Sequence, residues 1–417
     1  MNERNIVKAK IGVCYSETIP SRAQCTTPLQ IVFNILIAVF LSACGATPEP
    51  SATATPIPAT VNINLPDSPW GTVALIGQAP QLSAPAFAYT PADRITTWTG
   101  IQADNLATHY AIGITDEQSE LDVPTFFPQQ QMLFATTQGA LKIWLDRNAS
   151  ESGLRLHAST LNFDGTLATG IIPISVERTR NYDVMAIDTR QFRIVTSGGL
   201  GEITNLYLYQ IDDTGRPSGG ELLQIDGDHP ALLRDNQGQN HLFWLNDNGR
   251  NVFYAQFDEI ATPNLVNVRQ IARTNIAVTD AILDFSIAYD GTTVYLFWTI
   301  RRVDDTQVVL MSSGQLSDER FSSPAPLLTP DGDSIQWVSS ARQFQRPVPI
   351  VANHDETLSV LWLADGAIID NELVVESGRL IGLPQIDTAT DRIGISWAQS
   401  TNNGHANLFF VERPRLP

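Results

Sequence analysis

Charged residues gather in segments that precede predicted strands, and their types suit two kinds of chemistry. Arginine binds carboxylates or sulfates through paired hydrogen bonds from its planar guanidinium. Aspartate oxygens suit Ca²⁺, and an aspartate beside a histidine can serve as a general acid or base. The alternative is that these are solvated loop charges that pair with one another. The candidate ligand-binding residues are Arg178, Arg180, Tyr182, Asp226, Asp228, His229, Arg342 and Arg346. The four arginines among them are expected on one face of the fold, where together they could hold a carboxylate or sulfate.

Motifs of the common catalytic classes are absent from the sequence. It has no Gly-x-Ser-x-Gly elbow, no P-loop and no dinucleotide fingerprint. No two of its six histidines have the close spacing of a local zinc motif. We therefore assign no catalytic residue, no metal ligand and no cofactor, and keep Ca²⁺ as the alternative for the acidic segment. Whether the chain is an enzyme stays open, with a binding role favoured.

Composition limits the partners and the compartment. The chain has 44 acidic and 26 basic residues, a net charge of −18, and a hydrophobic content of 43%. Such a charge does not favour nucleic acid, because phosphates are neutralised by Lys and Arg. The three cysteines are Cys14, Cys25 and Cys44, so the long remainder has no disulfide and no thiol ligand.

The N-terminal segment is typical of a secretory signal peptide. The apolar run Ile31–Leu41 follows basic residues and ends in Ser42 and Ala43. It is shorter than the ~18 apolar residues of a spanning helix. Leu41-Ser42-Ala43-Cys44 resembles the bacterial lipobox, which implies cleavage before Cys44 and lipidation of its sulfur. The alternative is an ordinary signal peptide followed by an accidental cysteine.

The segment after the cysteine is predicted to be a disordered tether. Residues 45–69 are rich in Pro, Ala, Thr and Ser and lack apolar periodicity. The expected organisation is a signal peptide at 1–43, a tether at 44–69 and one folded domain at 70–417. The resemblance implies an extracytoplasmic protein, lipid-anchored to the bacterial cell membrane or cell surface.

Residues 70–417 show a repeated strand pattern and no convincing helix. Short β-branched and aromatic runs alternate with Asp, Gly, Asn and Pro turns. In six repeats a tryptophan ends the predicted second strand, and a seventh repeat has Val195 or Thr196 near that position. These tryptophans are Trp98, Trp144, Trp244, Trp298, Trp362 and Trp397.

This pattern predicts an all-β fold, a seven-bladed β-propeller, with six or eight blades as alternatives. The last repeat stops after its third strand, so Thr72–Gly77 is expected to complete the seventh blade and cover its edge. Leu222–Asp226 and Leu265–Ala272 are predicted outer strands. A β-sandwich pair or a β-solenoid are the other readings of the repeats.

The repeat tryptophans are expected to fill the space between blades. The alternative is a ring of aromatic side chains on one face that stacks on sugars. Trp70 and Trp337 lie outside the repeats, and Trp337 is the better candidate for an exposed contact.

The repeat form P-x-h-x-x-D-x-x-G-x-h-h-h-x-W, where h is apolar, resembles the blades of bacterial sialidase-like propeller proteins. The resemblance covers about residues 72–414 and implies a propeller. The family's Asp box, S-x-D-x-G-x-x-W, is absent, and the nearest segment, residues 235–238, has the wrong spacing. Arg346 enters a repeat roughly where the family's first carboxylate-binding arginine stands.

Three functions remain open. The first is a non-catalytic binding module for a protein partner or a glycan, attached to the membrane by lipid and expected to be a monomer. The second is a secreted glycan-active enzyme, a sialidase-like hydrolase or a lyase, with its site in the axial funnel. The third is an assembly component of the cell envelope that uses the propeller as a scaffold.

Overall fold

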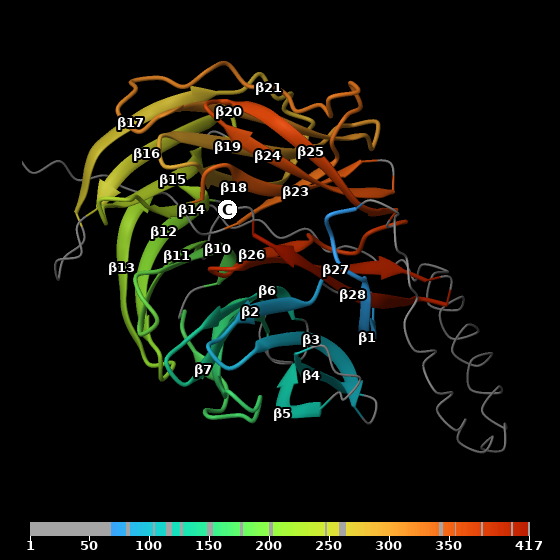
Figure 1. The fold of residues 1–417 in the computed structure, drawn as a ribbon. Helices are drawn as coiled ribbons and strands as arrows, with labels where there is room; N and C mark the ends of the chain where they lie inside the picture. The colour runs from blue at the N-terminus through green and yellow to red at the C-terminus, as the bar shows by residue number, and fades with distance from the viewer. Residues whose placement is uncertain are drawn as a thin grey trace, which may run out of the picture. The chain divides into compact units, whose positions relative to one another are not determined.

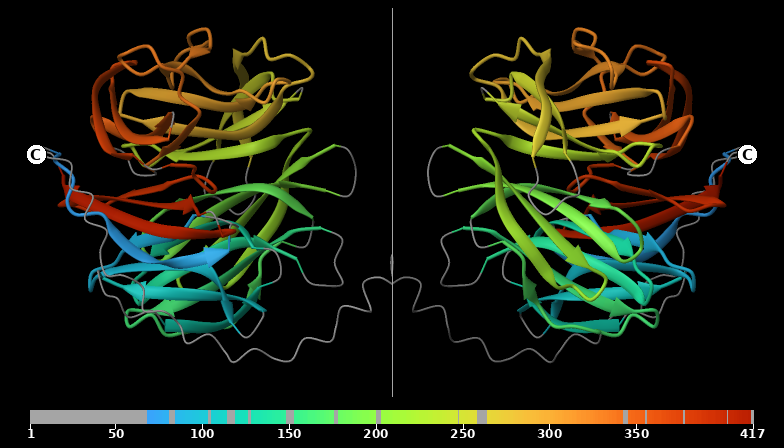
Figure 2. Two further views of the ribbon diagram at one scale, coloured as in Figure 1. Left: turned by 90° about the vertical axis from the view of Figure 1, so that its right-hand side faces the viewer. Right: turned by 90° about the vertical axis from the view of Figure 1, so that its left-hand side faces the viewer.

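The protein is a seven-bladed β-propeller. The computed structural model describes residues 68–80, 84–102, 105–113, 119–125, 128–147, 153–175, 178–199, 203–246, 248–257, 264–341, 345–354, 356–376, 378–401 and 403–415. These residues form seven four-stranded antiparallel sheets around one axis (Figures 1 and 2). Among them there is no helix of the length and apolarity needed to cross a membrane. The residues predicted to form the signal peptide, and nearly all of those predicted to form the tether, lie outside the described residues.

The strands of the first four blades follow one another in the sequence and are given from the axis outward. Blade 1 contains β2 (Ala86–Tyr89), β3 (Arg94–Gln102), β4 (Asn105–Ile112) and β5 (Ser119–Thr125). Blade 2 contains β6 (Gln129–Ala135), β7 (Gly139–Asp146), β8 (Arg155–Asn162) and β9 (Ile172–Pro173). Blade 3 contains β10 (Thr179–Ala186), β11 (Gln191–Gly198), β12 (Asn205–Asp212) and β13 (Pro217–Ile225). Blade 4 contains β14 (Asp228–Arg234), β15 (Asn240–Asn246), β16 (Asn251–Phe257) and β17 (Leu265–Arg273).

The last blade joins the two ends of the propeller domain. Blade 5 contains β18 (Ala281–Tyr289), β19 (Thr293–Arg301), β20 (Gln307–Gln315) and β21 (Ala325–Pro326). Blade 6 contains β22 (Trp337–Ser340), β23 (Val348–His354), β24 (Thr357–Ala364) and β25 (Ala367–Glu376). Blade 7 contains β26 (Gln385–Thr388), β27 (Arg392–Ser400), β28 (His405–Pro414) and, as its outer strand, β1 (Ala74–Pro80).

The predicted closure is confirmed. β1 pairs antiparallel with β28, with Ala74 opposite Phe410 and Pro80 opposite His405. Before β1, the Gly71 N–H donates to the Glu412 carbonyl at 3.0 Å. A strand from the start of the domain thus covers the open edge of the last blade, as the spare strand in the sequence indicated. The predicted outer strands of blades 3 and 4 correspond to β13 and β17.

The second strands of most blades are buried on both faces, because a neighbouring blade packs on each side. All eight residues of β7 are buried, whereas most of β13 and β17 is exposed or half-buried. Continuous burial explains why the second strands read as unbroken apolar runs. The tryptophans fill this space as predicted: Trp298 is fully buried and packs in one cluster with Phe243 and Tyr254 of the preceding blade.

The strand positions predicted for the sixth repeat are wrong by one strand. The sequence pattern put Arg346 before the innermost strand and Trp362 on the second. In the structure β22 is innermost, so Arg346 precedes the second strand and Trp362 lies on the third, β24. The sequences of β23 and β24 resemble those of the first two strands in the other repeats. The innermost strand β22 has four residues, too few to show an apolar pattern. The outer strand of this blade is β25.

Candidate functional site at the entry face

The two ends of the propeller differ in the side chains they present. We call the end at which the innermost strands begin the entry face, and the end at which they turn into the second strands the exit face. Asp228 begins β14 and therefore lies at the entry face. Asp290 follows β18 and lies at the exit face, where its carboxylate accepts the Asp365 N–H at 3.0 Å.

Four consecutive innermost strands have an irregular register near their entry-face ends. A bulge of this kind turns side chains away from the regular strand positions, and bulges are common beside functional sites. β2, β22 and β26 pair without such an interruption over their described residues. The interruptions lie between Gln129 and Met132, Thr179 and Asn181, Asp228 and Ala231, and Ile282 and Asp284.

Polar side chains from these strands and from β11 gather in blades 2 to 5. We call this group the entry-face cluster. Gln130 and His229 both have a φ of 47°, a backbone conformation that non-glycine residues rarely adopt. The members of the cluster are Gln130, Asn181, Asp183, Ser197, Asp228, His229 and Asp284.

Asp228 links blades 3 and 4. Its Oδ1 accepts hydrogen bonds from Ser197 Oγ at 2.6 Å, Asn181 Nδ2 at 3.0 Å and the His229 N–H at 2.8 Å. Burial alone raises the pKa of this carboxyl, but these hydrogen bonds and the charge of His229 hold the pKa well below its usual range. The carboxylate is thus ionised and already bonded, so its first role is to fix the cluster.

His229 and Asp284 are the members of the cluster whose side chains suit acid–base chemistry. His229 Nδ1 lies 3.5 Å from Asp228 Oδ2, and its side chain is 17% exposed. Burial is the main cause that raises the pKa of Asp284 to about 6; the positive charge of His229 opposes this shift, and the negative charge of Asp183 adds to it. A carboxyl with a pKa near 6 can exchange a proton close to neutral pH.

Tyr182 has a structural role. Its ring is 5% exposed, and its hydroxyl donates to the main-chain carbonyls of Gln130 and Ile143 in blade 2, the latter at 3.1 Å. Because the ring is buried and the hydroxyl is occupied, Tyr182 fixes blade 3 against blade 2. As a candidate ligand-binding residue it has no surface to offer a ligand.

The four candidate arginines do not share one face. Arg178 and Arg180 are exposed at the entry face, where β10 begins. Arg346 lies at the exit face, where its Nη2 binds Asp365 Oδ1 at 2.6 Å between two exposed side chains. The expectation that the four arginines share one face is therefore wrong. It rested on the assignment of the segment after Arg346 to the innermost strand of blade 6, whereas this segment is the second strand. Arg342 lies outside the described residues.

Asp226 stands at the entry face but apart from the cluster contacts. It is exposed, has a φ of 62°, and accepts hydrogen bonds from Asn246 Nδ2 through its carbonyl and its carboxylate, each at 3.1 Å. Within the described residues no three His, Cys, Asp or Glu side chains are arranged to hold a metal ion. Ca²⁺ at this segment stays a prediction.

Trp337 begins β22 and so lies at the entry face. It is half-buried, unlike the six tryptophans of the repeats, which are no more than 1% exposed. Trp70 is buried at 6% and packs beside the Arg413 guanidinium, which lies 5.7 Å from its ring centroid. Of the two tryptophans outside the repeats, only Trp337 offers part of a ring to solvent.

Sequence reasoning missed the cluster members that lie inside strands. Asp183 and Asp284 sit two or more residues into β10 and β18, and no turn or motif marks them. The available signal was an aspartate within an innermost strand, where apolar residues are expected.

Comparisons with known proteins agree on the fold. No family model and no curated protein matches the chain. Among solved structures, the polysaccharide lyase Uly1 aligns with a TM-score of 0.57 at 10% identity, over 82% of this chain and 91% of that one. A protein of unknown function from Dyadobacter fermentans gives 0.49 at 10% identity, over 82% and 99%. The six-bladed fucose-binding lectin from Aleuria aurantia gives 0.44 at 7% identity, over 71% and 97%. At these identities the similarity establishes a β-propeller and nothing finer.

Proposed function

We propose that the protein is a non-catalytic binding module whose entry-face cluster takes a glycan. The observation that carries this proposal is the run of four interrupted innermost strands, which brings amide, hydroxyl, carboxylate and imidazole groups to one end of the propeller. Such groups can donate to and accept from the hydroxyls of a sugar. The half-buried ring of Trp337 at the same face suits the C–H face of a sugar ring.

We further propose that the module is lipid-anchored outside the cytoplasm through Cys44. The support is the Leu41–Cys44 sequence and the short apolar run before it. A doubly or triply acylated cysteine gives stable attachment, whereas one chain binds only marginally. Cys44→Ser is expected to move the protein from the membrane fraction to the soluble fraction. A variant that stays with the membrane would contradict the anchor and leave the glycan site untouched.

Asp284 favours a second candidate, a glycan-active lyase or hydrolase that uses the same cluster. Asp284, whose pKa is about 6, lies on β18, and the imidazole of His229 lies on β14 of the adjacent blade; a carboxyl and an imidazole are the groups that general acid–base catalysis uses most often. The polysaccharide lyase with the same fold is consistent with this candidate. Proton abstraction or leaving-group protonation would then be the task of these two residues.

One experiment separates these functions. The purified protein is incubated with a mixed library of cell-surface and environmental glycans, and retention and cleavage are read by mass spectrometry. Retention without cleavage supports the binding module, and cleaved products support the enzyme. If neither occurs, the glycan proposal fails and a protein partner becomes the explanation. Arg346→Ala, on the exit face, is the matched control and is expected to behave as the unmodified protein.

A further inference from the structure

A second site lies between blades 4 and 5, away from the entry-face cluster. A pocket of about 220 Å³ opens where the chain crosses from β17 to β18 and meets β19 and β20. Typical pockets for drug-sized ligands are about 300–1,000 Å³, so this one fits a single residue-sized group. It is lined by Arg273, Asn275, Ile276, Asp280, Ile300, Arg302, Val308, Leu310, Ser323 and Pro324.

The floor of the pocket is aliphatic. Ile276, Ile300 and Val308 are 7%, 3% and 8% exposed, and Leu310 packs beside them half-buried. No aromatic ring lines it, so it lacks the flat surface on which sugars usually stack. Branched aliphatic side chains instead suit an aliphatic group, which gains by leaving water.

The rim is positively charged in a strongly acidic chain. Arg273 and Arg302 are exposed, and neither guanidinium makes an ion pair or hydrogen bond with another described residue, although the charge of Arg302 contributes to the lowered pKa of the exposed Asp304. Asp280 closes its own turn by accepting the Ala277 N–H at 3.3 Å. Two cations against one carboxylate leave the pocket net positive, whereas the chain as a whole carries −18.

We propose that this pocket binds the C-terminal residue of a partner polypeptide, with an aliphatic side chain on the floor and the free carboxylate between Arg273 and Arg302. Guanidinium groups hold carboxylates through paired hydrogen bonds, and capture of a terminal carboxylate is a recurring mode of peptide recognition. Asn275 and Ser323 are exposed on the rim and can bond the preceding peptide group. The site goes beyond the proposed glycan function and does not depend on it.

The test uses the full-length protein and the acetylated tetrapeptide Gly-Gly-Ser-Leu, with binding measured by calorimetry. The free acid is expected to bind at least about tenfold more tightly than its C-terminal amide, because the amide loses the charge-assisted hydrogen bonds. The free acid 4-methylpentanoate, which lacks the peptide groups, is expected to bind more weakly than the peptide. Equal binding of acid and amide, equal binding of peptide and 4-methylpentanoate, or no binding of the peptide would each overturn the proposal.

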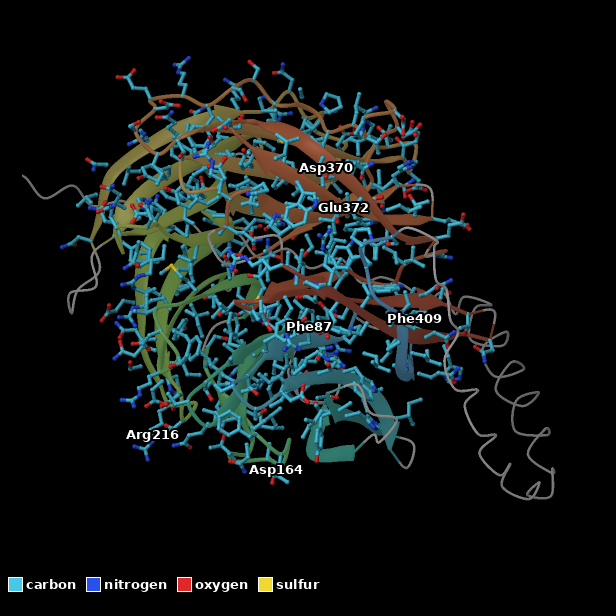
Figure 3. The ribbon with its side chains drawn as sticks, viewed as in Figure 1. Phe87, Asp164, Arg216, Asp370, Glu372 and Phe409 are labelled. Atoms are coloured by element: carbon cyan, nitrogen blue, oxygen red, sulfur yellow. The ribbon has the colours of Figure 1, made fainter. Side chains whose placement is uncertain are left out.

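Variants connect the binding to the pocket. Arg273→Gln with Arg302→Gln is expected to weaken peptide binding about tenfold or more and leave the melting temperature unchanged, since both side chains are exposed. The matched control is Arg216→Gln, an exposed arginine at the edge of blade 3 (Figure 3), which should bind as the unmodified protein does. Equal affinity in the double variant and in the control would place the peptide elsewhere and contradict the assignment.

Discussion

The Lys142 Nζ atom of blade 2 donates a hydrogen bond of 2.6 Å to Thr108 Oγ1 of blade 1. Lys142 is the one lysine among the described residues and is completely buried, with its ammonium 4.9 Å from the ring centroid of Trp144. Burial lowers the pKa of this lysine to about 7, and the charge of Asp146 only partly opposes the shift. Within the part of the chain that the structure describes, this ammonium group makes one hydrogen bond, so it is a costly component of the interface between blades.

Lys142→Met is therefore expected to stabilise the protein by about 1–4 kcal/mol at neutral pH, as replacing buried charges often does. In the unmodified protein the unfolded chain binds the proton more tightly than the folded one between about pH 7 and the ordinary lysine pKa of 10.5, so stability should rise with pH across that window. Denaturant titrations at pH 6, 8 and 10 would show the rise, and the variant should lose it. Equal pH dependence in both proteins would disprove the buried-charge argument.

Asp228→Asn is expected to destabilise the propeller by about 1–3 kcal/mol at neutral pH, because a neutral amide oxygen accepts more weakly than the carboxylate does from Ser197, Asn181 and the His229 N–H. The lowered pKa of Asp228 stabilises the fold above the unfolded value near 3.8, and this contribution is lost as pH falls below it. The variant should therefore show a shallower acid limb in thermal melts between pH 5 and 2. Asp226→Asn is the control, and loss of stability there of the same size would argue against a specific role for Asp228.

The outer strand of the seventh blade, β1, gives a third prediction. Ile76 of β1 is 5% exposed and packs in one cluster with Phe87 and Phe410, whereas Gln78 on the same strand is exposed (Figure 3 labels Phe87). Ile76→Ala should cost about 2–5 kcal/mol by leaving a cavity beneath the closing strand. Gln78→Ala should change the free energy of unfolding by less than about 0.5 kcal/mol. Chemical denaturation of both variants tests the closure; equal effects would mean that β1 contributes little.

The blades could be predicted from sequence because a buried second strand needs large apolar residues at fixed positions. Trp298 and Trp397 mark such strands, and the spare segment before the first repeat indicated β1. Blade 6 was misread because Trp362 has the same local surroundings on a third strand as the other tryptophans have on a second. The pattern of a short segment indicates whether its strand is buried. It does not indicate the position of the strand in the sheet, because that depends on pairings between distant residues, such as Trp337 with Asn353.

The candidate site could be predicted only in part, for a related reason. Asp228 and His229 stand in a loop-to-strand segment where polar residues are conspicuous. Asp284 belongs to the same cluster, but it lies within a strand and reaches it through a bulge that the sequence does not announce. Arg346 shows a different error. It was chosen as an arginine before an innermost strand, but the strand that follows it is the second of its blade, so it lies at the exit face.

The electrostatic interaction between Asp284 and His229 gives the last prediction, which joins stability to binding. The raised pKa of Asp284 means that the folded protein binds a proton more tightly than the unfolded chain between about pH 3.8 and 6, so this group lowers stability as pH rises through that window. Asp284→Asn should remove that loss and stabilise the protein at pH 7 by about 1–3 kcal/mol.

The same substitution, alone or with His229→Ala, should reduce glycan retention if the entry-face cluster is the site. Melting temperature and retention measured on the same preparations separate the two effects. A variant that is more stable and still retains glycan fully would move the site away from these residues, whereas one that retains glycan but no longer cleaves it would identify the pair as the proton-transfer groups of an enzyme.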